Sequence, residues 1–136
     1  MDREERSAYG VALSCRDFGD PGHVVPVSVD VEVTDLDDNG PLFTAAAAYN
    51  FTVAENNPRG HVIGRVSASD ADAGRHATIA YSLGGADNDS WAWFDVDASS
   101  GLITARVSFD REFVDHFRFV VVATSGSASS QVRTQI

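Results

Sequence analysis

Strict alternation of apolar and polar residues constrains this chain more than any other feature. In the stretch VVPVSVDVEV, valines occupy positions 25, 27, 29, 31 and 33, with proline or a polar residue between them. A period of two places these valines on one face of an extended chain. The pattern predicts a long strand over 25–33 that is buried on one face. The same alternation marks YNFTVAE (49–55) and FRFVVVA (117–123).

Shorter apolar runs predict further strands, and turn residues separate them. The shorter candidates cover 61–68, 77–83, 93–96 and 102–107. The turn signals are Asp20-Pro21-Gly22, Asn57-Pro58, Gly84-Gly85 and Ser99-Ser100-Gly101. The run AAAA at 45–48 is short and uncapped, so we interpret it as a connector rather than a helix. Many short strands without a helical period predict an all-β fold, most simply an antiparallel sandwich.

The chain also contains an internal repeat. Asp2-Arg3-Glu4 recurs as Asp110-Arg111-Glu112, and the same offset aligns the residues that follow each copy. Tyr9 then aligns with Phe117, Val11 with Phe119, Leu13 with Val121, Cys15 with Ala123, and Asp17 with Ser125. A repeat of roughly 110 residues has the size of one sandwich domain. We therefore expect residues 1–34 to end a first repeat, 35–41 to be a joint, and 42–136 to form a second repeat that lacks its end.

Composition narrows the classes of partner. Acidic residues outnumber basic ones 20 to 10, and the formal charge is −10. This balance disfavours nucleic acid or an anionic membrane surface as a partner, and suits a protein that binds cations. The single cysteine, Cys15, excludes an internal disulfide and is expected to be a small buried hydrophobe. No stretch approaches a membrane span, and the first residues lack the apolar core of a signal peptide. Two sequons are candidate N-glycosylation sites, at Asn50 and Asn88.

The run DLDDNGP (35–41) concentrates acidic groups more tightly than any other segment. Asp35, Asp37, Asn39 and Gly40 match the first positions of an EF-hand loop. Ala46 stands where that loop needs a bidentate glutamate, and a strand rather than a helix precedes the run, so we exclude an EF-hand. No histidine or serine nucleophile accompanies the run in a recognisable catalytic pattern, and we expect no enzyme. A solvated acidic turn and a cation site remain open for this run taken alone.

Acidic pairs elsewhere in the chain favour the cation site. They lie at strand ends or turns, and comprise Asp2/Glu4, Asp70/Asp72 and Asp110/Glu112, together with the single Glu55. A spacing of two lets alternate side chains converge on one ion, and Ca²⁺ prefers six to eight oxygen ligands. The distribution therefore predicts calcium shared by segments that are distant in sequence.

The ordered motifs resemble two consecutive extracellular cadherin repeats, of the protocadherin or Fat type. The motifs are DRE (2–4), DLDDNGPLF (35–43), AEN (54–56), DAD (70–72), FDVDASSGLI (94–103) and FDRE (109–112). The resemblance implies an antiparallel Greek-key, immunoglobulin-like β-sandwich, present as one partial and one nearly complete copy. It also implies about three Ca²⁺ ions at the joint.

The resemblance further implies which residues bind these ions. The expected side-chain ligands are Asp2, Glu4, Asp35, Asp37, Asp38, Asp70 and Asp72, and the expected main-chain ligands are Leu36, Asn39 and His76. Adjacent joints would use Asp17, Glu55, Asp110 and Glu112. Two departures concern one ion: Asp37 stands where the family has asparagine, and Ser125 stands where it has aspartate. We expect the ion nearest the second repeat to be the weakest of the three.

The function implied by this resemblance is calcium-dependent cell–cell adhesion. The partners would be other cadherin ectodomains, homophilic or heterophilic, with no nucleic acid and no small-molecule substrate. The location would be the extracellular face of the plasma membrane, in a single-pass protein whose transmembrane segment lies outside this sequence. One alternative is a rigid spacer without an adhesive face. Another is a calcium-dependent carbohydrate-binding sandwich, in which Trp91 and Trp93 would share one strand face.

Overall fold

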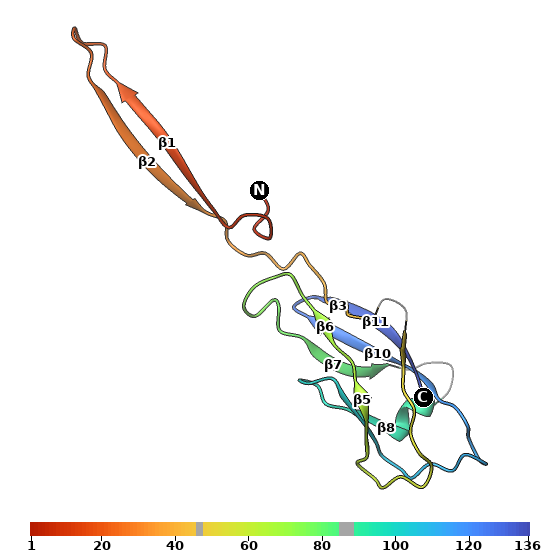
Figure 1. The fold of residues 1–136 in the computed structure, drawn as a ribbon. Helices are drawn as coiled ribbons and strands as arrows, with labels where there is room; N and C mark the ends of the chain where they lie inside the picture. The colour runs from red at the N-terminus through yellow and green to blue at the C-terminus, as the bar shows by residue number, and fades with distance from the viewer. Residues whose placement is uncertain (46–47, 85–88) are drawn as a thin grey trace. The chain divides into compact units, whose positions relative to one another are not determined.

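The computed structural model describes residues 1–45, 48–84 and 89–136, and separates into two compact units. Unit 1 is Met1–Leu36 and unit 2 is Asp37–Ile136 (Figure 1). The candidate glycosylation site Asn88 lies outside the described residues, whereas Asn50 is exposed at the end of a strand of unit 2. Among the described residues, no helix has the length and apolarity needed to cross a membrane.

Unit 1 is built on one antiparallel hairpin. Strand β1 (Ala8–Arg16) pairs with β2 (Val24–Glu32) in a register that sets Val11 opposite Val29 and Leu13 opposite Val27. Cross-strand neighbours on one face of a hairpin pack against each other, which favours this register. The alternating valines therefore do form a strand, as predicted, and they share a face with the apolar residues of β1.

The predicted burial of that face is wrong for unit 1. Val25 and Val27 are 58% and 45% exposed, and Cys15, expected to be buried, is also exposed. Residues 1–36 are all described, and they contain the hairpin as their single sheet, so unit 1 supplies no second layer to cover the apolar face. Alternation reports which side chains share a face, and burial depends on what packs against that face.

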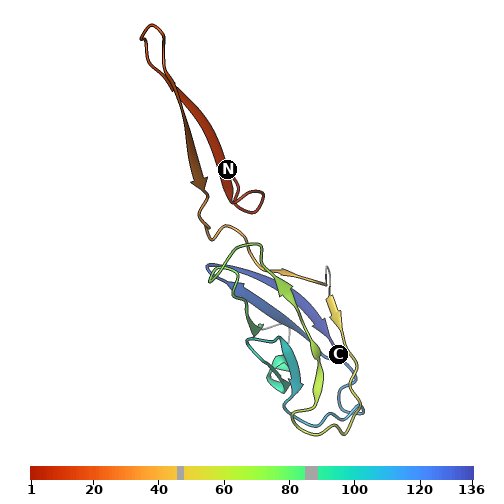
Figure 2. The same ribbon diagram turned by 60° about the vertical axis from the view of Figure 1, so that its left-hand side comes forward.

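Unit 2 consists of three sheets and a short 3₁₀-helix (Figures 1 and 2). One sheet has the order β4-β11-β10-β7, a second has the order β5-β9-β8, and β3 pairs with β6. Every pairing among the described residues is antiparallel except that of β4 with β11, which is parallel. The elements are β3 (Leu42–Phe43), β4 (Ala48–Asn50), β5 (Val62–Arg65), β6 (Ala68–Ser69), β7 (Ala80–Gly84), η1 (Asp89–Trp93), β8 (Phe94–Val96), β9 (Leu102–Ala105), β10 (Arg118–Ser125) and β11 (Ala128–Gln135).

The core of unit 2 lies between its sheets and is rich in aromatic rings. Phe119, Val121 and Ala123 alternate along β10 and are each at most 1% exposed. Phe94 of β8 stacks on Phe119 with ring centroids 4.7 Å apart, and Phe117 lies 5.3 Å from Phe94. Burial of this apolar surface is the main stabilising contribution to the unit. The all-β sandwich predicted from the sequence is confirmed.

Several predicted strand boundaries differ from those in the structure. The stretch 61–68 is split between β5 and β6, and the stretch 77–83 becomes a strand only from Ala80. Trp91 and Trp93 lie in η1 rather than on a strand, so they do not share a strand face. Trp93 packs against Phe117 and Phe113, at centroid distances of 5.4 and 6.3 Å.

Gly101, at the turn between β8 and β9, is required by both its conformation and its surroundings. Its φ is +68°, and a Cβ atom there would lie 2.4 Å from the carbonyl oxygen of Val66. We predict that Gly101→Ala lowers the free energy of unfolding by about 3 kcal/mol or more, because left-handed strain and a backbone clash combine. Urea denaturation of the calcium-free chain measures this.

Gly60→Ala is the matched control for this prediction. Gly60 also has a positive φ, of +79°, but a Cβ there would meet no atom within 4 Å. It should therefore show the left-handed strain alone, about 1–2 kcal/mol. Equal losses for the two variants would contradict the contribution assigned to the Val66 carbonyl.

Candidate metal centre

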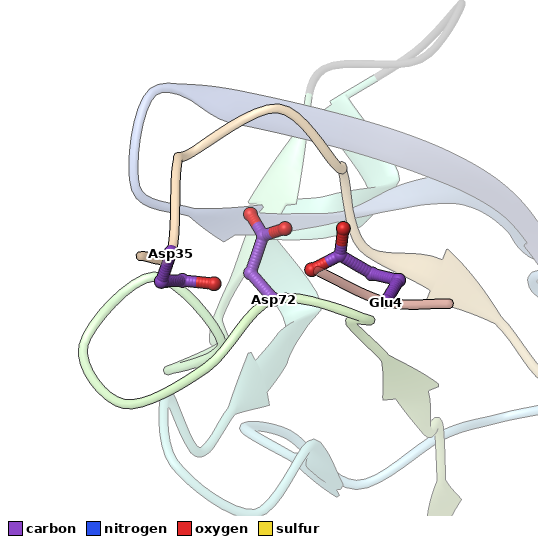
Figure 3. Close-up of side chains that lie close together, drawn as sticks. All are labelled: Glu4, Asp35 and Asp72. Atoms are coloured by element: carbon purple, nitrogen blue, oxygen red, sulfur yellow. The ribbon is translucent and has the colours of Figure 1, made fainter. Parts of the chain in front are cut away.

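In unit 1, a turn at Asp2-Arg3-Glu4 brings two acidic groups together. The main-chain NH of Arg6 donates to the carbonyl of Asp2 at 2.9 Å, and the NH of Glu4 donates to Asp2 Oδ1 at 2.9 Å. Hydrogen bonding with Glu4 lowers the pKa of Asp2 below its ordinary value. Glu4 and Asp35 each offer a carboxylate oxygen, and these atoms lie within 4.8 Å of each other (Figure 3).

Arg3 supplies the local positive charge in this turn. Its Nε lies 2.6 Å from Asp35 Oδ1, and its guanidinium also pairs with Glu4. A guanidinium between two carboxylates offsets their mutual repulsion. Arg3 therefore holds the two carboxylates of unit 1 close together.

In unit 2, the side-chain amide of Asn39 organises two carboxylates. Its Nδ2 donates to Asp72 Oδ1 at 2.7 Å and to Asp38 Oδ1 at 3.0 Å, while its main-chain NH lies 3.3 Å from Asp72 Oδ2. Asp72, drawn in Figure 3, lies in the loop after β6, and its own NH donates to Asp70 Oδ1 at 2.9 Å. The sequence predicted a main-chain role for Asn39 and did not anticipate that its side chain ties these carboxylates together.

Asp37 is held by the β10–β11 turn. Both the main-chain NH and the Oγ of Ser127 donate to Asp37 Oδ2, each at 2.9 Å. These two hydrogen bonds lower the pKa of Asp37, because they favour its charged form. Asp37 Oδ1 is buried and accepts no hydrogen bond from the described residues. Buried oxygens of this kind are rare, and a bound cation is one arrangement that satisfies them.

Ser125, two residues before Ser127, contacts the other side of the same acidic region. Its Oγ donates a short hydrogen bond to Asp70 Oδ2, and the residue is 2% exposed. Ser125 thus binds a carboxylate rather than providing one. The side-chain ligands predicted here are carboxylate oxygens, and the main-chain carbonyl was the ligand expected from His76. This set suits a hard cation such as Ca²⁺ better than zinc.

A second acidic group lies elsewhere in unit 2. Glu55, Asp110 and Glu112 each offer an oxygen within 4.8 Å of the others. Glu112 NH donates to Asp110 Oδ1 at 3.0 Å, and Val114 NH donates to the carbonyl of Asp110 at 3.0 Å. This turn repeats the hydrogen bonds of the Asp2 turn in unit 1, as the internal repeat predicts. The three residues were predicted to belong to one set, and the structure brings them together.

Asn57 fixes the position of this second group and was missed by the sequence reasoning. Its Oδ1 accepts from Phe109 NH at 2.9 Å, and its Nδ2 donates to the carbonyl of Val107 at 3.0 Å. These bonds tie the segment of Glu55 to the segment of Asp110. The Asn57-Pro58 pair signalled a turn, but a turn signal does not reveal that the side chain is buried.

The remaining predicted residues lie in turns or loops. Asp17 follows β1, and its Oδ1 accepts from His23 NH at 2.7 Å and Gly19 NH at 3.2 Å. The side chain of Leu36 is exposed, which is compatible with the main-chain role predicted for it. His76 is half-buried, and its NH donates to the carbonyl of Ala73 at 3.2 Å.

Comparison with known proteins identifies the family to which these features belong. The model of the cadherin domain matches residues 49–136. Human protocadherin beta-1 is 36% identical over 142 residues, which cover the whole chain and 17% of the relative. Human protocadherin Fat 4 is 35% identical over 126 residues, covering 93% of the chain and 2% of the relative. The chain therefore spans only a small part of the relatives that it matches.

A solved structure agrees with the sequence matches. "Protocadherin Gamma B2 extracellular cadherin domains 3-6" superposes with a TM-score of 0.90 and 35% identity, and the match covers 99% of this chain and 33% of that one. Fold, family model and sequence identity lead to the same conclusion. This chain belongs to the cadherin family.

Proposed function

We propose that this chain is a calcium-binding segment of a cell-adhesion ectodomain, in which Ca²⁺ at the 35–41 joint restrains two successive repeats. The observation that carries the proposal is Asp37, whose buried Oδ1 lacks a hydrogen-bond donor among the described residues while Ser127 secures its Oδ2. The proposed boundaries are 1–34 for the end of one repeat, 35–41 for the joint and 42–136 for the next repeat.

The proposed ligands carry seven negative side-chain charges, which exceed the one positive charge that Arg3 supplies beside Glu4 and Asp35. They include the carboxylates of Asp2, Glu4, Asp35, Asp37, Asp38, Asp70 and Asp72, with main-chain oxygens of Leu36, Asn39 and His76. The carboxylates repel one another, and the attraction of each carboxylate to a bound Ca²⁺ outweighs that repulsion. About three ions would bring nearly the charge needed for balance. Extracellular calcium modules bind at about 10⁻⁴–10⁻³ M, so such a joint is ordered where calcium is abundant.

Adhesion follows from the family rather than from a surface of this chain. Cadherins are adhesion proteins without enzymatic activity, and the partners we propose are other cadherin ectodomains, homophilic or heterophilic. The matched structure is described as extracellular domains, which supports a location outside the cell, in a longer membrane-anchored protein. Glu55, Asp110 and Glu112 would serve a further joint, and Asp17 the joint before. A spacer role uses the same calcium sites and differs only in lacking an adhesive face.

The carbohydrate-binding alternative gains no support from the aromatic residues that suggested it. A sugar platform needs exposed rings on one face. Trp93 is stacked on Phe113 and packed against Phe117, and Trp91 is 38% exposed in a 3₁₀-helix.

Asp72→Asn tests the proposed calcium function. The substitution keeps an oxygen that can accept from Asn39 but removes a charge from the proposed ligand set. We expect calcium affinity to fall by about tenfold or more, since charged oxygen ligands dominate Ca²⁺ binding. Calorimetric titration, with thermal unfolding in calcium and in chelator, measures this. Asp30→Asn, which removes a charge from the exposed face of β2, is the control and should leave affinity unchanged. Equal affinity for wild type and Asp72→Asn would contradict the proposal.

Ser125→Asp tests the expected weakness of the ion nearest unit 2. The new carboxylate would replace a hydroxyl that now donates to Asp70. We predict tighter binding of the last ion to bind, because a charged ligand replaces a neutral one. If the last Ca²⁺ binds Ser125→Asp no more tightly than it binds wild type, Ser125 does not limit the affinity of this ion.

A further inference from the structure

We propose that Ser127 is a positioning residue that makes Asp37, rather than an asparagine, the required residue at its position in the calcium site. The inference rests on the proposed calcium function and deepens it. It concerns residues of unit 2 only, and it assigns a role to a turn that contributes no ligand of its own.

The β10–β11 turn is built for close approach to Asp37. Ser125 pairs with Ala128, which leaves Gly126 and Ser127 as a two-residue turn. Gly126 has a φ of +50°, and a Cβ there would lie 2.4 Å from each carboxylate oxygen of Asp37. Tight hairpins favour glycine at this point, and here the missing side chain also makes room for the carboxylate.

Ser127 makes the two oxygens of Asp37 inequivalent. Two donors from one residue converge on Oδ2, at 2.9 Å each, while Oδ1 stays buried without a donor among the described residues. We call these two hydrogen bonds the Ser127 clamp. The clamp occupies Oδ2 and therefore leaves Oδ1 as the oxygen that would bind a cation. Because the clamp restricts rotation of the carboxylate, less side-chain entropy remains to be lost when the ion binds.

An asparagine in this position could not satisfy both sides. If its single oxygen accepted from Ser127, its NH₂ group would take the place of Oδ1 and repel the ion. If the oxygen turned toward the ion, the NH₂ group would oppose the NH and hydroxyl donors of Ser127. A carboxylate has acceptors on both sides, so the Ser127 clamp favours aspartate over asparagine at residue 37.

The same turn explains how the site keeps its charge. Ser125 aligns with Asp17 in the internal repeat, so one carboxylate is missing at this position of unit 2. Its hydroxyl instead donates to Asp70 Oδ2. Asp37 restores the lost negative charge from the linker side, and Ser127 holds it in place. Ser125 at the end of β10 and Ser127 in the turn that follows thus position two proposed ligands, Asp70 and Asp37.

A double-mutant cycle on the full chain tests the role of Ser127. Ser127→Ala removes the hydroxyl donor but keeps the main-chain NH, and we expect affinity for the weakest Ca²⁺ to fall about threefold to tenfold, as for one lost hydrogen bond of ordinary strength. In the Asp37→Asn background the same substitution should change affinity less than about twofold, or raise it, since the amide oxygen is then free to turn toward the ion. Ser129→Ala, an exposed serine of β11, is the control and should have no effect.

Terbium provides a second readout that a purely structural role would not change. With Tb³⁺ bound in place of Ca²⁺, a mobile Asp37 admits more water to the ion, so Ser127→Ala should shorten the luminescence lifetime and Ser129→Ala should not. If wild type binds no calcium, the proposed function fails. If wild type binds calcium and Ser127→Ala behaves like Ser129→Ala, the proposed function stands and this inference is overturned. Equal losses from Ser127→Ala in the wild-type background and in the Asp37→Asn background would also overturn it.

Discussion

Repulsion between neighbouring carboxylates is the constraint around which the acidic end of unit 2 is organised. Asp38, Asp70 and Asp72 would separate in the absence of opposing interactions, and the chain supplies a hydrogen-bond donor for each. Asn39 donates to Asp38 and Asp72, and Ser125 donates to Asp70. Such hydrogen bonds fix the positions of the carboxylates. They lower the cost of gathering the charges without cancelling them, which leaves an oxygen-rich region that a hard cation can complete.

The sandwich core determines where these donors lie. Ser125 ends β10, the strand that contains the buried residues Phe119, Val121 and Ala123. Packing of β10 in the core therefore fixes the position of the turn that follows it. Side chains on rigid strands are placed more accurately than those on long loops. The second acidic group depends on the core in the same way, because Asn57 is bonded to Phe109, itself packed against Phe117 at a centroid distance of 4.9 Å.

Much of this arrangement could be predicted from residue patterns, and the exceptions have physical causes. Alternation located β2 and β10, and the ordered acidic motifs predicted that Glu55, Asp110 and Glu112 would meet. Strand β11 went unmarked because its polar sequence lacks clear alternation. The exposure of Cys15 could not be read from its strand, since burial depends on the layer opposite. Ser127 carried no signal at all: its contact with Asp37 joins residues that only the tertiary fold brings together.

The central claim is that Ca²⁺ restrains the joint between the two repeats, and small-angle X-ray scattering tests it most directly. The full chain would be measured in millimolar calcium and again with chelator, beside a variant in which Asp70 and Asp72 are both replaced by asparagine. The account predicts that calcium lengthens and narrows the distance distribution of the wild-type chain and leaves that of the variant unchanged. Identical wild-type profiles with calcium and with chelator would contradict it.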